Sequence, residues 1–246
     1  MRKLSGKWIA AKESMNDASR AYQKQITGTN QVWMQKLDIT KRYSDRAKAR
    51  LDGEGTTPLA RGLYDEYKNT VRIVDYDFMG TPFYNSLSNG IKLNAMADLH
   101  NPIGAMSTYF HEIGHMIDDY AGNGQTWLSS DPEYRKCLQQ DADALINKTM
   151  ITRHCDLAEA YDIISEELCG NWNANISDIF GSLTGCRCQG DWGHHFTYWE
   201  ADQCRVEKEA FANMFEASIG DSKKLETMKT FFPHAYERFE YIIRSR

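Results

Sequence analysis

The sequence predicts an α+β protein that is mostly helical and has a small antiparallel sheet. Two short runs in the first half, residues 71–76 and 90–96, are rich in β-branched residues or alternate apolar and polar side chains, as strands do. After residue 105, apolar side chains return every three or four positions over long stretches, which is typical of amphipathic helices. Strands therefore come early in the chain, and helices come late.

Residues 1–55 are predicted to form a helical N-terminal appendage, and residues 56–246 the main domain. Between residues 7 and 51 the chain is polar and rich in Ala, Lys, Gln and Arg, which favours two or three helices with a break near residues 27–30. Apolar residues are too sparse there for an independent core, so we expect this segment to pack on the main domain or to contact a partner. Residues 52–58 are mostly turn formers and mark the boundary.

The main domain begins with a short helix over residues 59–68, which leads into the strand at residues 71–76. The second strand, at residues 90–96, precedes a turn and then a helix over residues 105–120. Further helices are expected at residues 132–149, 156–171, 206–219 and 222–244.

The composition excludes several classes of protein. With 41% hydrophobic and 26% charged residues over 246 positions, the chain is of the globular type and long enough to bury a core. The excess of 34 acidic over 29 basic residues argues against nucleic-acid binding, because phosphate recognition needs a basic face. No apolar run approaches the roughly 20 residues of a membrane span. Lys7 and Lys12 interrupt the start of the chain, so we expect no signal peptide.

Six cysteines lie in the second half of the chain. A chain with an adequate core and no secretion signal has little need of disulfides, so we interpret them as mostly free thiols in a reducing compartment. The alternative is a second metal site at Cys186 and Cys188 with His194 and His195, although this spacing fits no standard structural-zinc pattern. The six are Cys137, Cys155, Cys169, Cys186, Cys188 and Cys204.

Residues 111–115, His-Glu-Ile-Gly-His, carry the clearest chemical signal in the chain. On a helix, His111 and His115 lie one turn apart on the same face, so both imidazoles can bind one metal ion. A catalytic Zn²⁺ takes three protein ligands and leaves one position for water. Between the two histidines, Glu112 can take a proton from that water and pass it to a leaving amine. The pattern therefore predicts one Zn²⁺ per chain and hydrolysis of a peptide bond.

The surroundings of this motif are those of an amphipathic helix, with its histidines off the apolar stripe. Asp118 and Asp119 continue the histidine face and are candidates to accept the second N–H of a ligand histidine. The strand at residues 90–96 is expected to capture an extended peptide through a free edge, and Asn94 in it is a candidate substrate-binding residue. The motif also occurs by chance on solvated helix faces, but the preceding strand and turn favour a zinc site.

A third ligand has to come from another segment, and residues 206–219 are the best candidate. Apolar side chains cover most of this predicted helix and leave Glu209, Asn213 and Glu216 as a narrow polar stripe. A carboxylate on a mostly buried helix needs a partner, and zinc would be one. The alternative is that the stripe faces water. Glu207 is the rival ligand, because it falls within the apolar arc.

Residues 111–122 resemble the zinc helix of the anthrax lethal factor type of gluzincin metallopeptidase. That group holds its glutamate ligand in an E-x-F-A-x-x-F setting, which residues 209–215 match. The resemblance implies a zincin-like fold, metallopeptidase activity and Glu209 as the third ligand.

The lethal factor group also has a tyrosine shortly before the glutamate ligand that stabilises the oxyanion. The position seven residues ahead of the glutamate holds Asp202 in this chain. Tyr198, eleven residues ahead, is therefore the candidate catalytic tyrosine. His194 and His195 are further candidates for this donor, and His195 is also a candidate substrate-binding residue.

A second resemblance is to the metallopeptidase domains of phage and prophage minor head (head morphogenesis) proteins of Gram-positive bacteria. It implies a phage or prophage origin, a location in the bacterial cytoplasm or the virion, and phage head proteins as partners. The segments that carry it lie within roughly residues 60–220 and are residues 90–94, 111–122, 176–184, 193–199 and 209–215.

Two functions follow from these observations. The first is a zinc-dependent endopeptidase acting on a protein or peptide, with zinc held by His111, His115 and Glu209 and with Glu112 as general base. The second is a phage minor head or assembly protein that uses the fold for binding rather than for cleavage. The presence of Glu112 favours the enzyme, because a binding module needs no base. A toxin acting on a host protein would share the same chemistry.

Overall fold

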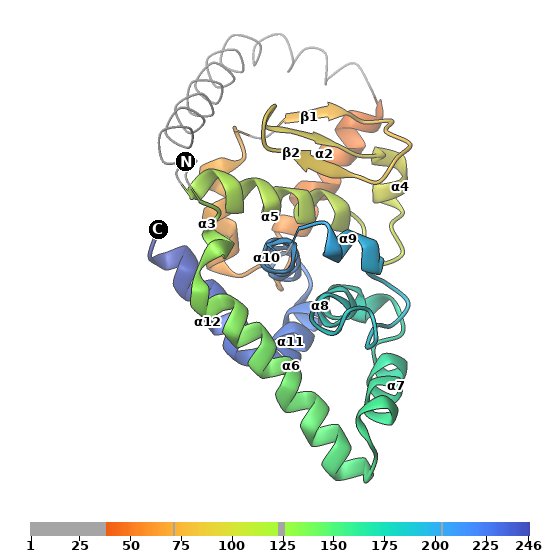
Figure 1. The fold of residues 1–246 in the computed structure, drawn as a ribbon. Helices are drawn as coiled ribbons and strands as arrows, with labels where there is room; N and C mark the ends of the chain where they lie inside the picture. The colour runs from red at the N-terminus through yellow and green to blue at the C-terminus, as the bar shows by residue number, and fades with distance from the viewer. Residues whose placement is uncertain (1–37, 71, 123–125, 203) are drawn as a thin grey trace.

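A computed structural model describes residues 38–246, apart from residues 71, 123–125 and 203. The helices predicted within residues 7–37 lie outside the described residues. The described chain is mostly helical and has a three-stranded sheet, so the α+β class is confirmed (Figure 1). In chain order, the elements are α2 (Asp38–Leu51), α3 (Pro58–Tyr67), β1 (Arg72–Asp75), β2 (Phe83–Asn85), β3 (Gly90–Lys92), α4 (Ala95–Leu99), α5 (Ser107–Ala121), η1 (Leu128–Ser130), α6 (Pro132–Arg153), α7 (Leu157–Glu167), η2 (Asn171–Asn173), α8 (Ala174–Thr184), α9 (Phe196–Glu200), α10 (Arg205–Ala217), α11 (Ser222–Phe231) and α12 (Pro233–Arg244).

The sheet is mixed, so the prediction of an antiparallel sheet was wrong. β3 is the central strand and pairs in parallel with β1 and antiparallel with β2. The strand predicted at residues 90–96 therefore has no free edge, and the edge strand that contacts α5 is β2. Sequence analysis missed β2 because it is three residues long and follows the turn-forming run at residues 80–82.

α5 lies beneath the sheet and supplies the centre of the hydrophobic core (Figure 1). Phe110, Ile113 and Ile117 are fully buried. They lie three and four residues apart, as expected of the core-facing stripe of a helix. The same helical periodicity turns His111 and His115 to a different face of α5.

Gly114 lets α5 and α10 approach each other closely. A Cβ atom at this position would lie 2.7 Å from the Cα of Ala212 in α10, which is shorter than any ordinary packing distance. Ala212 is itself fully buried. The small residues at this crossing hold together the two helices that carry His111, His115 and Glu209.

α10 runs through the middle of the helical layer, with α5, α8, α11 and η1 packed around it. Every residue from 209 to 217 is buried. Glu209, Asn213 and Glu216 are only 4%, 5% and 1% exposed, so the polar stripe of this helix faces other protein groups and not water.

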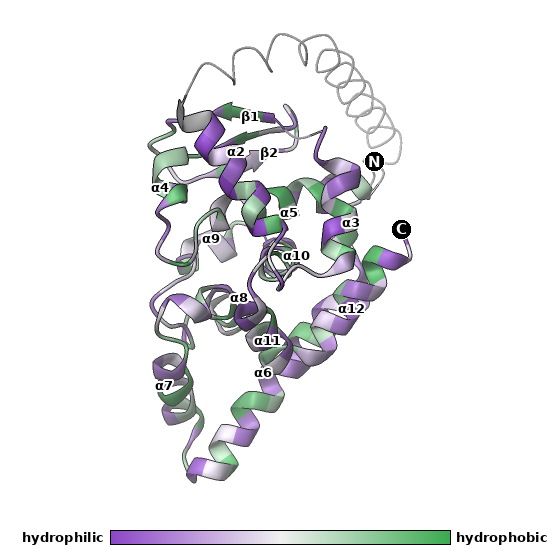
Figure 2. Ribbon diagram, turned by 180° about the vertical axis from the view of Figure 1, so that it is seen from behind, coloured by the Kyte–Doolittle hydropathy of each residue, from purple (hydrophilic) through white to green (hydrophobic). Residues whose placement is uncertain are grey.

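The C-terminal part of the chain departs from the prediction at one point. The single helix predicted over residues 222–244 is two helices, α11 and α12, because a helix cannot continue through Pro233. α12 lies along the long helix α6, which forms a hairpin with α7 that extends away from the sheet (Figure 1). Along α12, hydrophilic and hydrophobic residues alternate (Figure 2), and Tyr236 and Phe239 are buried in the core.

α2 is the described part of the predicted appendage, and it packs on the rest of the molecule. Tyr43, Ala47 and Leu51 are buried in the same core as α5. Arg50 donates hydrogen bonds to the carbonyls of Ala105 and Ile219, at 3.0 and 3.1 Å. The division into domains at residue 55 stays a prediction.

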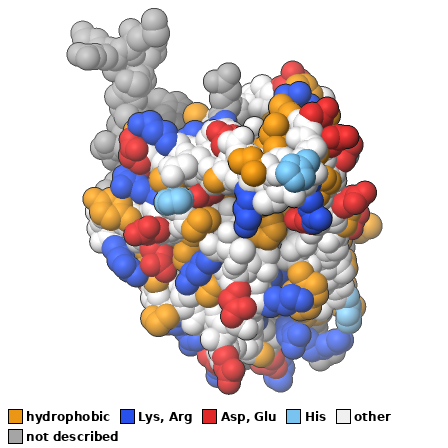
Figure 3. Space-filling model, turned by 90° about the horizontal axis from the view of Figure 1, so that it is seen from below, with side chains coloured by type: hydrophobic (Ala, Val, Ile, Leu, Met, Phe, Trp, Pro, Cys, Tyr) orange, Lys and Arg blue, Asp and Glu red, His pale blue; other side chains and the backbone are white. Residues whose placement is uncertain are grey.

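The surface carries charges of both signs. On the face seen in Figure 3, Lys and Arg side chains are interspersed with Asp and Glu, and hydrophobic side chains lie in small separate groups. Among the described residues, no helix combines the length and the apolar character that crossing a bilayer requires.

Candidate metal centre

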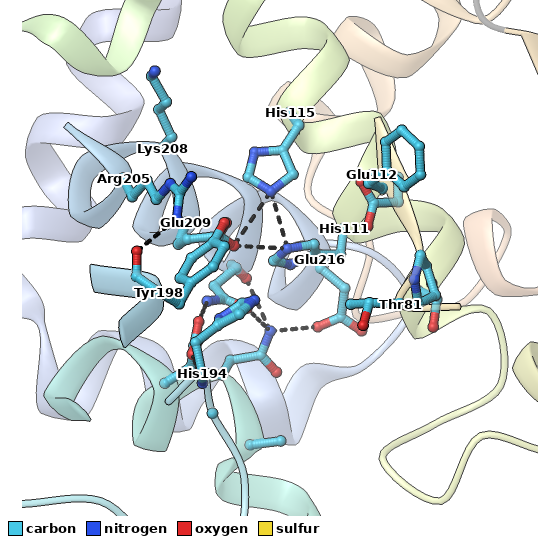
Figure 4. Close-up of a pocket in the computed structure, with 18 of the residues that line it drawn as sticks. Thr81, His111, Glu112, His115, His194, Tyr198, Arg205, Lys208, Glu209 and Glu216 are labelled. Atoms are coloured by element: carbon cyan, nitrogen blue, oxygen red, sulfur yellow. Dashed lines mark hydrogen bonds and ion pairs between the residues drawn. The ribbon is translucent and has the colours of Figure 1, made fainter. Parts of the chain in front are cut away.

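Three side chains with metal-binding atoms meet at the crossing of α5 and α10. Nε2 of His111 lies 3.0 Å from Oε2 of Glu209 and 3.1 Å from Nε2 of His115, and the distance from His115 Nε2 to Glu209 Oε2 is 3.3 Å. Figure 4 shows the three side chains pointing toward one another. The two imidazoles are one turn apart on α5, and their rings meet edge to face, at an interplanar angle of 88°.

The donor set fits a zinc ion. Zinc takes imidazole nitrogens and carboxylate oxygens at about 2.0–2.2 Å, so three ligands of a tetrahedron lie about 3.4 Å from one another. The observed separations of 3.0–3.3 Å are close to this value. Two histidines and one glutamate leave one position of the tetrahedron for water or substrate, as catalytic zinc sites do.

The two neighbouring histidines stabilise the charged form of the Glu209 carboxylate. Burial would raise its pKa, but His115 and His111 outweigh burial and keep the pKa of Glu209 well below its ordinary value. Burial acts against a charge on His111 too, yet the hydrogen bond and charge of Glu209 raise the pKa of His111 to about 9. A proton on His111 and a metal ion thus compete for the same place beside Glu209, because a ligand histidine has to be neutral.

Glu207, the rival ligand, lies outside this group. It is two residues before Glu209 on α10 and therefore about 200° around the helix axis. Its Oε2 forms an ion pair with Nη1 of Arg135 in α6, at 3.2 Å. Of the two glutamates, the structure brings only Glu209 to the histidines.

Glu112 is placed to act on a group bound at the cluster. It lies in α5 between the two histidines and is 5% exposed. It lines a cleft that His111, His115 and Glu209 also line. Its Oε2 is buried and makes no hydrogen bond with the described part of the chain. Burial raises the pKa of Glu112, although the charges of His115 and His111 act against the rise. A buried carboxylate with a raised pKa and a free oxygen is well suited to accept and return a proton.

Tyr198, the predicted oxyanion donor, lines the cleft but is hydrogen-bonded to one of the candidate metal ligands. Its hydroxyl donates a hydrogen bond to Oε1 of Glu209. Its ring stacks on the imidazole of His194, with 3.9 Å between the centroids. Burial and the charge of Glu209 raise the pKa of Tyr198 above its ordinary value, so the phenol keeps its proton.

His194 belongs to a second polar group, which Asp178 of α8 organises. Nδ1 and the backbone N–H of His194 both lie 2.9 Å from Oδ1 of Asp178, and Asn213 donates to Oδ2 at 3.0 Å. Asp178, His194 and Glu209 have donor atoms within 4.8 Å of one another. Because both oxygens of Asp178 already accept hydrogen bonds, we interpret Asp178 as the group that orients His194.

Sequence analysis missed Asp178, although a signal was present. Asp178 is 6% exposed in a helix whose neighbours, including Ile176, Ile179 and Phe180, are buried. A carboxylate among such residues requires partners, as was argued for Glu209. The sequence analysis did not predict α8, so the helical position of Asp178 relative to the buried residues was not considered.

The remaining candidates are Asp118, Asp119, Asn94 and His195. Both oxygens of Asp118 accept hydrogen bonds from Ser129, at 2.7 and 2.6 Å, and Asp119 accepts one from Tyr84 at 3.1 Å. Asn94 caps α4 by accepting from the backbone of Ala97 and does not line the cleft. His195 is exposed and lines the cleft.

The cysteines do not form a metal site within the described chain. All six are free thiols, and none belongs to a group of metal-binding side chains. Cys186 instead lies 3.5 Å from the carbonyl of His194. Cys188 is buried, and burial raises the pKa of its thiol to about 11.

The group of His111, His115 and Glu209 opens into a cleft of about 1000 Å³. Residues 81–84, which include the start of the edge strand β2, line one side, together with Glu112 of α5 (Figure 4). The opposite side is lined by residues of α9 and α10, among them Tyr198, Arg205 and Lys208. A chain of several residues can therefore lie across the cluster, between β2 and α10.

Compared with models of protein families, with curated proteins and with solved structures, the chain matches none significantly. Its function has to be argued from the geometry of the site.

Proposed function

We propose that the protein is a zinc-dependent endopeptidase of the zincin type. The observation that supports it best is the position of Glu112, a buried carboxylate with a free oxygen, beside three side chains with the donor set of a catalytic zinc site. A purely structural metal site closes its coordination with a fourth ligand and needs no such base.

In this proposal His111, His115 and Glu209 hold the metal, which supplies a Lewis acid that makes a water molecule more acidic and polarises the substrate carbonyl. Glu112 accepts the proton of the attacking water and delivers it to the amine of the leaving peptide. Its burial favours the protonated form of the carboxyl, which helps it to take up this proton.

The developing oxyanion needs a hydrogen-bond donor, and two residues across the cleft from Glu112 are candidates. Burial would lower the pKa of His194, but Asp178, which accepts a hydrogen bond from Nδ1, raises it, so a protonated ring can donate from Nε2. Tyr198 is the candidate from sequence, and it can serve once its hydroxyl leaves Oε1 of Glu209. We therefore favour protonated His194 for the role, because it needs no change in the hydrogen bonds of Glu209.

The edge strand β2 is the element placed to bind the substrate backbone. It pairs with β3 on one side, and residues 83 and 84 line the cleft. An extended peptide can add to such an edge through main-chain hydrogen bonds. This replaces the predicted strand at residues 90–96, whose two neighbours already use its hydrogen-bonding groups.

The variant Glu112→Gln tests the proposal. It removes the base but none of the ligands, so the protein should keep about one zinc per chain and lose about 10²–10⁴-fold in peptide hydrolysis. Zinc is measured by elemental analysis and hydrolysis by mass spectrometry of a random peptide mixture. Glu207→Gln, outside the cluster, is the matched control and should retain both. A wild-type protein that binds zinc but cleaves no peptide would contradict the proposal.

A further inference from the structure

The side of the cleft formed by α9 and α10 carries an arginine, Arg205, that has no counter-ion among the described residues. Nη1 of Arg205 donates to the carbonyl of Tyr198 at 2.6 Å, and its guanidinium lies 4.3 Å over the ring of the same tyrosine. A guanidinium has five N–H donors, and the described residues provide this one acceptor. Within the described chain no carboxylate lies at ion-pair distance from Arg205, although other arginines of the protein have such partners.

Lys208, one turn further along α10, adds a second cation to the same wall. Its Nζ lies 4.5 Å over the ring of Trp127 and 3.6 Å from a carboxylate oxygen of Asp202. This ion pair is long, and the Asp202 side chain is 42% exposed, so the pair is weak. Asp202 can balance at most one of the two positive charges, and the charge of Arg205 remains.

The nearest buried carboxylate does not balance Arg205 either. Glu209 contacts His111, His115 and Tyr198. In the proposed function its negative charge would be balanced by the metal ion. Arg205 and Lys208 lie on the opposite side of the cluster from Glu112 and Thr81 (Figure 4). The cleft therefore has a cationic wall on one side of the reacting centre and a strand edge on the other.

We propose that Arg205 and Lys208 form an anion-binding subsite, which binds an Asp or Glu side chain of the substrate close to the bond that is cleaved. This rests on the proposed peptidase function and specifies its substrate class. Arg205 can bind a carboxylate with two parallel N–H donors, because its aromatic stacking on Tyr198 leaves the edge of the guanidinium free. Lys208 adds a point charge one turn away.

The alternative is that Arg205 only holds Tyr198 in place. A positioning role would be lost equally for all substrates when Arg205 is changed. A charge-recognition role predicts that the preferred substrate changes when the charge of residue 205 is reversed. It also predicts that the preference weakens as added salt screens the interaction.

The test uses zinc-loaded full-length protein and a random peptide mixture, followed by peptide pairs that differ only in Glu or Gln near the cleaved bond. We expect the Glu peptide to be preferred by about 10- to 100-fold in kcat/KM. Arg205→Gln and Lys208→Gln should each reduce this ratio, and Arg205→Glu should favour a Lys peptide over the Glu peptide. Lys136→Gln, an exposed cation in α6, is the control and should leave the ratio unchanged.

A binding measurement separates the subsite from the catalytic proposal. In the Glu112→Gln background, fluorescence anisotropy gives the Kd of an Ala-based peptide with one central Glu and of its Gln twin. If no peptide is hydrolysed by the wild type but the Glu peptide binds more tightly and loses this advantage in Arg205→Glu, the subsite stands and the peptidase proposal fails. Equal binding of the twins, or a preference that Arg205→Glu does not change, overturns the subsite.

Discussion

Glu209 and Glu216 occupy the same face of α10, two turns apart, and both are almost completely buried. Glu209 contacts two imidazoles and a phenol in the wall of an open cleft. Glu216 contacts Lys224 at 2.8 Å, the guanidinium of Arg50, and Asn175, which donates to it at 2.9 Å. Glu216 is thus paired with two cationic side chains, whereas the side chains around Glu209 can all be neutral.

This difference separates a structural carboxylate from a candidate metal ligand. The charge of Glu216 is compensated by the protein, which ties α10 to α2 and α11. With a metal ion bound, the metal would balance the charge of Glu209 and both histidines would be neutral. Without a metal ion, a proton on His111 balances that charge. Between the two glutamates, Asn175 of α8 donates hydrogen bonds to both Asn213 and Glu216 of α10.

Removing the carboxylate of Glu209 should have the largest effect. Glu209→Ala leaves two histidines, so the zinc content should fall from one equivalent per chain toward zero, and peptide hydrolysis should fall to background. Elemental analysis after desalting measures the zinc content. Glu207→Ala, which loses only an ion pair with Arg135, should keep its zinc. A Glu209→Ala protein with stoichiometric zinc would place the third ligand elsewhere.

Removing the carboxylate of Glu216 should affect the fold instead. Glu216→Ala leaves Arg50 and Lys224 buried without a counter-ion, and we expect the free energy of unfolding to fall by about 3–5 kcal/mol. Urea denaturation of the metal-free protein measures it. Glu226→Ala, at an exposed position of α11, should cost less than about 0.5 kcal/mol. Equal stability of the two variants would show that the Glu216 cluster is not structural.

The crossing of α5 and α10 links the two clusters, and a methyl group at Gly114 tests it. Gly114→Ala places a Cβ against the backbone of Ala212, which should cost about 1–3 kcal/mol and weaken zinc binding. Gly62→Ala in α3 is the matched control, because its Cβ would meet no atom within 4 Å. That variant should gain about 0.5–1 kcal/mol. Thermal unfolding of both variants, with and without zinc, measures the difference.

The smallest expected effect is in the acid dependence of stability. Burial would raise the pKa of Glu216, but Lys224 and Arg50 outweigh it and hold that pKa well below its ordinary value. A carboxylate with a lowered pKa in the folded state stabilises the protein above its unfolded pKa, and this contribution is lost as the pH falls below about 4.3. Glu216→Gln should therefore be less stable than wild type at pH 7 and should have a shallower loss below pH 4. Parallel curves for the two proteins would contradict this.

The sequence predicted the centre of the site because its parts follow local rules. His111, Glu112 and His115 are fixed by helical spacing, and the apolar surroundings of Glu209 on its own helix marked it as a carboxylate in need of a partner. The choice of Glu209 over Glu207 came from the resemblance to the lethal factor group. The resemblance to phage head proteins, and the origin and partners that it implies, stay predictions.

The errors concern features that depend on long-range pairing. The pattern of residues 90–96 cannot show whether a strand is central or at an edge, and β2, the actual edge, is too short for a pattern. Asn94 was assigned to substrate on the basis of that strand, and the structure makes it a helix cap. The pair of His194 and Asp178 joins a loop to a helix that the periodicity did not reveal.

The α5–α10 junction also has a consequence for how the protein is made. The histidines and Glu209 are separated in sequence by the whole of α6, α7, α8 and α9. During synthesis His111 and His115 leave the ribosome long before Glu209, and Lys224 of α11, which with Arg50 balances the charge of the buried Glu216, follows later still. A growing chain therefore has no complete candidate metal site until Glu209 has been synthesised. In the proposed function, hydrolysis therefore requires that both helices have been made and that α5 has packed on α10.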